Sequence, residues 1–222
     1  MDFSKIFTNN WRFLLEPYLN TPEFIAHMQW IESEYKSDRV IYPEGRKVFR
    51  AFNLCQPEKV RVVWLGLDPY PNENATGLSM AVPPNTIKFP PTLQKLEFEY
   101  NNDLGHDGMD LTFVSYADRI LFLNTALTVE YGRTKSHWKE WQPFTEFVLK
   151  TINEKCNNLL FVLLGNEAKS YEHLIDKRIH KILALPHPVA EVYKPGIGFL
   201  GSKLFTKINT HVKDYFQESN IF

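Results

Sequence analysis

Four short apolar runs of this chain each end in, or are followed directly by, polar residues that could carry out chemistry. Asp68 follows the first run, Asn124 ends the second, Gly165 and Asn166 close the third, and His187 follows the fourth. A carboxylate can stabilise an oxocarbenium-like sugar and orient water, whereas a neutral histidine can donate a hydrogen bond to a leaving group that gains negative charge. An amide can read the hydrogen-bonding edge of a base. Together these groups suit cleavage of a nucleoside N-glycosidic bond.

Other reaction classes lack the residues that they need. The chain has no glycine-rich phosphate loop of the Walker or dinucleotide type, and no histidine or cysteine cluster at metal-ligand spacing. No candidate serine nucleophile lies on a sharp strand-to-helix turn. The sequence therefore leaves no part for phosphoryl transfer, and we expect neither a metal nor an organic cofactor.

The four apolar runs are expected to be the strands that hold these groups together. They span residues 60–66, 120–124, 159–165 and 179–185, and their weak alternation is typical of strands buried on both faces. Residues with helical spacing lie between them and before them, and residues 21–23 (TPE) are a good helix start. Strands that alternate with helices predict an α/β fold with one doubly wound parallel sheet, which binds ligands beyond the carboxyl ends of its strands.

The composition predicts a single domain over residues 1–222. With 44% hydrophobic and 23% charged residues, the chain can bury a sizeable core, which excludes an intrinsically disordered or a disulfide-rich protein. It contains no run of about 18 apolar residues and no secretory signal. We therefore expect no membrane contact and a cytoplasmic location, or a nuclear one if the source is eukaryotic or viral. Cys55 and Cys156 are interpreted as reduced, packed thiols.

The charges are balanced overall but unevenly distributed. The formal net charge is −1, which argues against a protein that coats nucleic acid. Residues 169–213, however, carry eight basic and three acidic side chains, a local excess of five positive charges. Such an excess could serve a polyanion, although on charge alone solvated helix faces are the better explanation.

Several ordered motifs resemble those of the family-1 uracil-DNA glycosylases, over about residues 11–209. Residues 66–71 (GLDPYP) are similar to that family's G-Q-D-P-Y-H motif, and residues 121–129 (LFLNTALTV) to its L-L-N-x-x-L-T-V segment. Residues 89–93 (FPPTL), 163–168 (LLGNEA) and 187–188 (HP) look like its proline-rich loop, its Gly-Ser loop and the start of its H-P-S-P-L motif. The resemblance implies a three-layer αβα domain with a central four-stranded parallel sheet, and removal of uracil from DNA in base excision repair.

The resemblance also implies a role for each residue of the catalytic site. Asp68 would stabilise the oxocarbenium-like sugar and position the attacking water, and His187 would hydrogen-bond uracil O2 as charge moves onto the leaving base. Asn124 would pair with the uracil edge, and the Tyr70 ring would exclude the methyl group of thymine. The uracil must first be flipped out of the duplex. His137, in a further motif, would either support the fold or contact DNA.

Two substitutions alter the base pocket relative to the family pattern. Leu67 replaces a glutamine, which removes a polar side chain but leaves a backbone N–H that could still bind the base. Met80 stands where the family has a stacking phenylalanine, and a thioether covers the face of a base less rigidly than a ring does.

The loops expected to hold the DNA strand depart further from the pattern. Contacts to the phosphates are expected near Pro90, Pro91, Thr92, Gly165, Asn166 and Pro188. Val189 replaces the phosphate-binding serine of the H-P-S-P-L motif, and Glu191 puts an anion where its leucine enters the duplex. Either Val192 or Tyr193 is the wedge instead, with Tyr193 as our candidate, or flipping in duplex DNA is weak.

We therefore predict a monofunctional uracil-DNA glycosylase that acts as a monomer on single- or double-stranded uracil-containing DNA. A protein inhibitor or a replication partner is compatible with this role. Two alternatives stay open. Leu67 and Met80 motivate a glycosylase with altered base specificity, whereas Val189 and Glu191 motivate a DNA-binding replication accessory protein with weak or no catalysis.

Overall fold

A four-stranded parallel sheet lies at the centre of the computed structural model, which describes residues 3–222. Its strands are β2 (Val62–Gly66), β3 (Ile120–Asn124), β5 (Leu160–Leu164) and β6 (Lys181–Leu185), in the order β3-β2-β5-β6. Gly66 pairs with Asn124 in the register, so the last residues of β2 and β3 lie side by side. The predicted α/β fold with one parallel sheet is confirmed.

The four strands differ in burial. β2, β3 and β5 are buried along their whole length, as their apolar sequences predict. β6 is only partly covered and begins with the exposed Lys181, so the prediction that the fourth run is buried on both faces is wrong. The physical reason is its place in the sheet: β6 pairs with β5 alone, whereas β3, at the other edge, packs against α3 (Arg50–Leu54).

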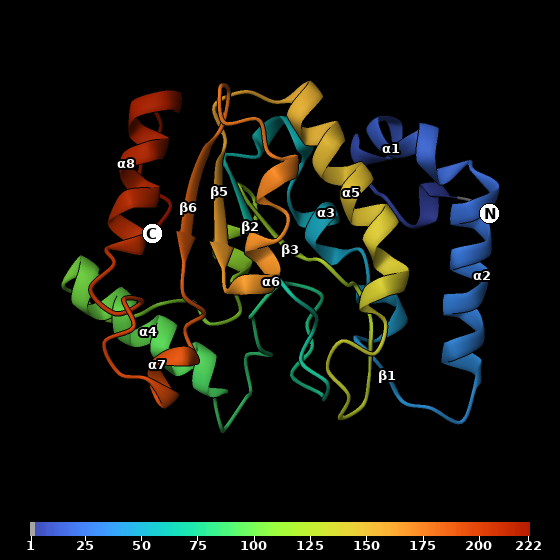
Figure 1. Cartoon of the computed structure of the whole chain (residues 1–222), viewed down its shortest axis with the longest axis horizontal. Helices are drawn as coiled ribbons and strands as arrows, with labels where there is room; N and C mark the ends of the chain where they lie inside the picture. Colours follow the sequence, from blue (N-terminus) through green and yellow to red (C-terminus); the bar gives the residue numbers. More distant parts are fainter. Residues whose placement is uncertain (1–2) are drawn as a thin grey trace.

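Helices cover both faces of this sheet, which gives the three layers seen in Figure 1. On one side lie α1 (Trp11–Leu19), α2 (Pro22–Lys36), α3 and α5 (Trp138–Lys155), and on the other lie α4 (Pro91–Leu104) and α8 (Leu204–Phe216). The short helices α6 (Asn166–Lys169) and α7 (Ala190–Tyr193) follow β5 and β6, and β1 (Ile41–Tyr42) pairs with β4 (Val129–Glu130) in a small antiparallel ribbon.

Aromatic side chains fill the layers between the sheet and the helices. Trp64 of β2 contacts Phe122 of β3 and Phe205 of α8, with ring centroids 5.6 and 6.5 Å apart. On the other side, Phe144 of α5 stacks on Phe24 of α2 at 5.4 Å. Burial of one such side chain contributes about 2–3 kcal/mol. The strand ends that bear the polar residues therefore rest on a rigid core.

The helix start predicted at residues 21–23 is present. The Thr21 hydroxyl accepts a hydrogen bond from the Phe24 N–H at 3.2 Å, and Pro22 occupies the first helical position. Among the described residues, we find no helix with the length and apolar character needed to cross a membrane.

Candidate active site

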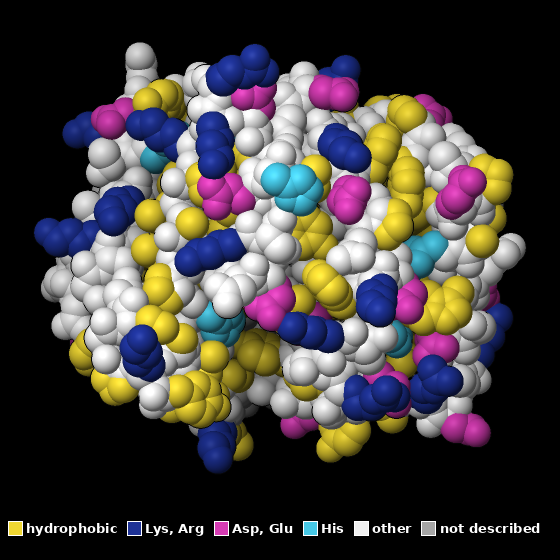
Figure 2. Space-filling model, viewed as in Figure 1, with side chains coloured by type: hydrophobic (Ala, Val, Ile, Leu, Met, Phe, Trp, Pro, Cys, Tyr) yellow, Lys and Arg dark blue, Asp and Glu magenta, His cyan; other side chains and the backbone are white. Residues whose placement is uncertain are grey.

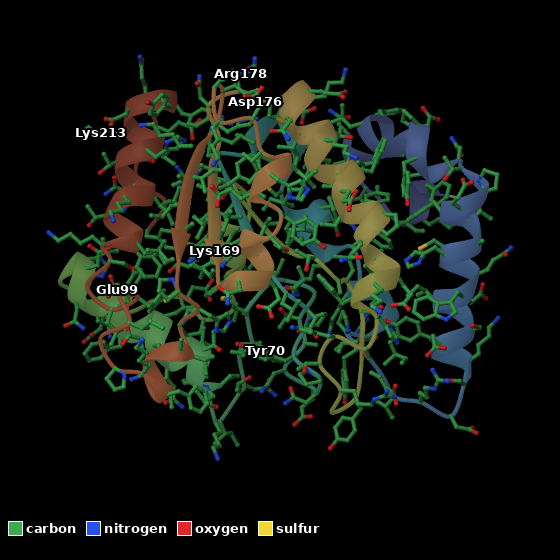
Figure 3. The ribbon with its side chains drawn as sticks, in the orientation of Figure 1. Tyr70, Glu99, Lys169, Asp176, Arg178 and Lys213 are labelled. Carbon is green, nitrogen blue, oxygen red and sulfur yellow. The ribbon has the colours of Figure 1, made fainter. Side chains whose placement is uncertain are left out.

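A cavity of about 200 Å³ lies at the carboxyl ends of the parallel strands. Its lining includes seven residues that the sequence predicts for the site: Leu67, Asp68, Tyr70, Met80, Thr92, Asn124 and His187. Tyr70 lies just beyond the lower edge of the sheet in Figure 3, where the strand arrows end. The structure therefore brings together side chains that are up to 120 positions apart in the chain.

A larger cavity, of about 730 Å³, lies elsewhere and shares none of these residues. It is bordered by Met28, Ile31 and Tyr35 of α2 and by Val48 and Phe49. Its lining includes the carboxylate of Glu32 and the amide of Asn53, but no imidazole and none of the residues that the sequence predicts for the site. The smaller cavity is therefore the candidate active site.

Gly66 allows two polar side chains to approach the end of β2. A Cβ atom at this position would lie 2.0 Å from Ser79 Oγ and 2.6 Å from Asn124 Oδ1, so a larger residue is excluded. The Asn124 side chain is only 5% exposed, and within the described chain its Oδ1 atom has no hydrogen-bond partner. A buried acceptor without a partner costs about 1–3 kcal/mol. Asn124 Oδ1 is therefore set to receive a donor from a ligand in the cavity.

Asp68 is held by a backbone amide from a distant loop. Its Oδ2 atom accepts a hydrogen bond from the Lys135 N–H at 2.5 Å. Burial raises the pKa of Asp68 above its ordinary value, and the hydrogen bond from Lys135 partly offsets this effect. The carboxylate thus points in a fixed direction and is poorly solvated, which strengthens its interaction with a nearby positive charge.

His187 has a defined direction of hydrogen bonding. The Val189 N–H donates to His187 Nδ1 at 3.2 Å, so the proton of the neutral ring is on Nε2. Burial lowers the pKa of His187, although the nearby Glu167 acts to raise it. Gly165, at φ +89°, provides the space, since a Cβ there would lie 3.0 Å from His187 Cβ. The imidazole is therefore a neutral donor, as the predicted mechanism requires.

Tyr70 and Met80 form one wall of the cavity. The Tyr70 hydroxyl donates a hydrogen bond to the Met80 carbonyl at 3.2 Å, and Met80 adopts φ +63°. Burial raises the pKa of Tyr70, which keeps the phenol neutral. Leu67 precedes this wall in the chain. Its backbone is held in place because its carbonyl accepts hydrogen bonds from both the Thr125 hydroxyl and the Ala126 N–H, each at 2.8 Å.

The loops predicted to contact DNA surround the cavity, but not every group in them is free. Pro90, Pro91 and Pro188 have no N–H, so Thr92, in the first turn of α4, is the first amide donor of its loop. Val189 was expected among the DNA contacts, but its N–H donates to His187 Nδ1 and is not free to bind a phosphate. Asn166 is exposed at the start of α6.

Glu191 does not face the DNA side as an exposed anion, and that prediction is wrong. Its side chain is only 3% exposed, and its carboxylate accepts hydrogen bonds from the backbone N–H groups of Gly196, Gly198, Phe199 and Leu200. Burial acts to raise the pKa of Glu191, but these hydrogen bonds outweigh it and leave the pKa below the ordinary value. Tyr193, two residues later, is 84% exposed. The buried carboxylate therefore folds the loop, and the exposed aromatic ring projects from it.

The basic excess of residues 169–213 is not gathered at the cavity. Figure 3 places Arg178 and Lys213 at the end of the molecule opposite Tyr70, and Figure 2 shows basic side chains scattered among acidic ones on this face. Arg178 is paired with Asp176 at 2.6 Å, and Lys177 with Glu172 at 2.6 Å. These two pairs take up two basic and two acidic residues, so they leave the local excess of five positive charges unchanged. The interpretation of this region as a DNA-binding surface therefore stays a prediction.

Three polar residues of the site were missed from the sequence. Ser79 and Thr134 line the cavity, and Glu167 lines it while forming an ion pair with Lys135. Glu167 stands in the loop resembling the Gly-Ser loop, but only tertiary contacts reveal its partner. His137, for which support or DNA contact was left open, is 3% exposed and its Nδ1 lies 2.9 Å from the Thr128 hydroxyl oxygen. It is a supporting residue.

Comparison with known proteins gives a consistent result. The sequence model described as "Uracil DNA glycosylase superfamily" matches residues 52–213. The chain is 37% identical to the uracil-DNA glycosylase of Aliarcobacter butzleri over 96% of this chain and 99% of that protein, and 38% identical to that of Campylobacter hominis over 90% and 85%.

Solved structures share the fold. A mimivirus UNG variant, Y322L, in complex with UGI superposes with a TM-score of 0.85 at 22% identity, covering 96% of this chain and 86% of that one. The UNG of Nitratifractor salsuginis superposes with a TM-score of 0.61 at 18% identity, covering 89% and 95%. At these identities the likeness concerns the fold.

Proposed function

The chain belongs to the uracil DNA glycosylase superfamily, and from this premise we propose how its cavity performs the reaction. The protein is a uracil-DNA glycosylase, a hydrolase of DNA repair that cleaves the bond between uracil and deoxyribose and leaves an abasic site. The observation that carries the assignment of the cavity is the unpartnered, buried Asn124 Oδ1, in a lining that also contains the oriented Asp68 and His187 side chains.

Asn124 recognises uracil through its two amide atoms. Its Oδ1 accepts the hydrogen from uracil N3, and its Nδ2 donates to uracil O4, whereas cytosine presents the opposite pattern of donor and acceptor. The fixed ring of Tyr70 occupies the space next to C5, which excludes the methyl group of thymine. Met80 covers one face of the base, and the Leu67 N–H is available for uracil O2.

Bond cleavage needs one group for each charge that develops. As the bond between C1′ and N1 breaks, its electron pair leaves with uracil, and the Nε2–H of His187 stabilises the anion by donating to O2. The sugar becomes oxocarbenium-like, and the carboxylate of Asp68 stabilises this cation. Asp68 then orients a water molecule, which adds to C1′ and gives the abasic site.

DNA is the substrate, and the reactive uracil must leave the base stack to enter the cavity. We assign phosphate contacts to Thr92 and Asn166 around its mouth, and the wedge that replaces the flipped base to Tyr193. Gly165 is left out because its N–H already donates to the Leu185 carbonyl at 3.0 Å. Support for the wedge comes from its 84% exposure on a loop that Glu191 holds from inside. We further propose that one domain over residues 1–222 acts as a monomer, and that a protein inhibitor or a replication partner can bind its DNA-facing side.

A single assay tests this function. A labelled oligonucleotide with one uracil, single-stranded or paired with G or A, is incubated with the protein in EDTA and then treated with hot alkali. We expect alkali-dependent cleavage at the uracil, and we expect Asp68→Asn and His187→Ala each to slow it by at least about 100-fold.

The opposite result would be equally informative. If both variants cleave at nearly the wild-type rate, the roles of Asp68 and His187 are wrong. If the folded protein binds DNA but leaves uracil intact, a panel of modified bases separates altered base specificity from a DNA-binding accessory role, for which affinity would not depend on uracil.

A further inference from the structure

An ion pair joins two distant segments beside the cavity. Lys135 lies in the loop that leads from β4 into α5, and Glu167 lies in α6, directly after β5. The Lys135 Nζ atom is 2.6 Å from Glu167 Oε1, and the two side chains are 48% and 39% exposed. Glu167 lines the cavity, and so does Thr134, the residue before Lys135 in the chain. The ion pair therefore spans the mouth of the cavity.

The same loop supplies the amide that orients Asp68. Lys135 donates its backbone N–H to Asp68 Oδ2 at 2.5 Å while it adopts φ +63°, a conformation that is unfavourable for a residue other than glycine. The preceding residues 131–134 are exposed, so packing does little to hold the loop. Its nearby restraints are hydrogen bonds such as that from the Gly132 N–H to the Pro71 carbonyl at 2.8 Å.

We propose that the ion pair between Lys135 and Glu167 is a strap across the mouth of the cavity that keeps the Lys135 amide on Asp68. Both are then positioning residues of the reaction, since neither needs to touch the reacting atoms. The proposal rests on the function proposed above, because it concerns the orientation of the same catalytic carboxylate.

The strap also balances charge beside the reacting groups. Besides Asp68 and His187 themselves, the charged or titratable groups at or beside the cavity are Lys135 from the loop before α5, Glu167 from α6 and Tyr70 from the loop after β2. Glu167 acts to raise the pKa of both Asp68 and His187, whereas Lys135 acts to lower that of Asp68. An unpaired carboxylate at position 167 would oppose the negative charge that develops on uracil, so Lys135 has to stay close to it.

The pair is expected to act on the reaction and not on stability. Exposed ion pairs contribute little to the free energy of unfolding. Loss of this one should therefore leave the thermal unfolding midpoint unchanged while it lowers kcat. An exposed pair without a positioning role would leave both the unfolding midpoint and kcat unchanged.

The test uses Lys135→Met, Glu167→Gln and the exchanged pair Lys135→Glu with Glu167→Lys, on a single-stranded uracil oligonucleotide. Methionine keeps a Cβ at φ +63°, so the backbone strain is unchanged. The matched control is Lys177→Met, which removes the exposed pair with Glu172 away from the cavity. We expect kcat to fall about 5- to 10-fold in each single variant, with KM within about twofold, and to recover at least half of the loss in the exchanged pair.

The pH profile adds a readout that a structural effect would not produce. Activity requires ionised Asp68, and the hydrogen bond from the Lys135 N–H lowers the pKa of Asp68 more than the Glu167 charge raises it. Loss of the strap should therefore move the acidic limb of kcat to higher pH in both Lys135→Met and Glu167→Gln. Unchanged kcat and an unchanged limb in both variants would overturn the strap. So would a rise in KM alone with a weaker salt dependence, which would make Lys135 a phosphate contact. Asp68→Asn, run alongside, must be inactive, which separates this result from failure of the proposed function.

Discussion

At the scale of single residues, hydrogen bonds within the protein fix the side chains of the cavity and leave one atom or face of each available to the substrate. The Tyr70 hydroxyl is engaged by the Met80 carbonyl, so its ring is fixed and free to act as a steric wall. Tyr70→Ala should therefore make thymine cleavage measurable and should slow uracil cleavage about 10-fold or more, because the base is held less tightly. The measurement uses two oligonucleotides of the same sequence, one with a single uracil and one with a single thymine at the test position, each opposite an abasic-site analogue. The rate of cleavage at the test position is compared between them.

The matched control at this position is Tyr70→Phe, which keeps the ring and removes only the hydrogen bond to Met80. It should continue to exclude thymine. Thymine cleavage by the phenylalanine variant, or none by the alanine variant, would show that another residue sets the specificity at C5.

At the scale of elements, the loop between β6 and α8 is organised by buried carboxylates. Glu191 accepts four backbone N–H groups within the loop, and Glu99 of α4 accepts those of Gly201 and Lys203 at its end. Glu191→Ala should release the loop and lower cleavage of duplex DNA about 10-fold or more, with little effect on single strands, because only the duplex requires a wedge. Tyr193→Ala should give the same change in the ratio of duplex to single-strand rates.

Tyr193→Leu distinguishes a wedge from a loop effect, since leucine keeps an apolar side chain that can enter the base stack. We expect it to retain most of the duplex activity. Equal losses on both substrates in the Glu191 or Tyr193 variants would contradict this division of roles.

At the scale of the whole molecule, buried histidines should make stability depend on pH. Burial lowers the pKa of five histidines below the ordinary 6.5: His27, to about 4, and His137, His180, His187 and His211. Below pH 6.5 the unfolded chain binds more protons than the folded one, so acid favours unfolding. The free energy of unfolding should fall by at least about 1 kcal/mol between pH 7 and pH 5.

Urea unfolding at several pH values measures this dependence. His27→Gln should flatten the curve between about pH 6.5 and 4, since burial lowers the pKa of His27 to about 4 and this residue does not line the cavity. Asp68 contributes with the opposite sign, because its raised pKa favours folding in acid. Stability that is constant from pH 7 to pH 5 would mean that the histidines are already accessible to protons in the folded state.

The α/β class, the central strands and the residues that we propose as catalytic all follow from the sequence alone. This was possible because burial on both faces requires apolar runs such as 62–66, and because parallel strands bring their following residues to one edge. Asp68, Asn124 and His187 therefore had to meet, whatever the details of the loops between them.

What the loops do with their polar groups depends on the folded structure. A carboxylate such as Glu191 can face solvent or bind backbone amides, and its neighbours in sequence do not distinguish the two. The free acceptor of Asn124, the tautomer of His187 and the pairing of Lys135 with Glu167 likewise depend on which donors and charges arrive from elsewhere. Hydrogen bonds and ion pairs act over a few ångströms, so they are set by distances between atoms that no sequence spacing specifies.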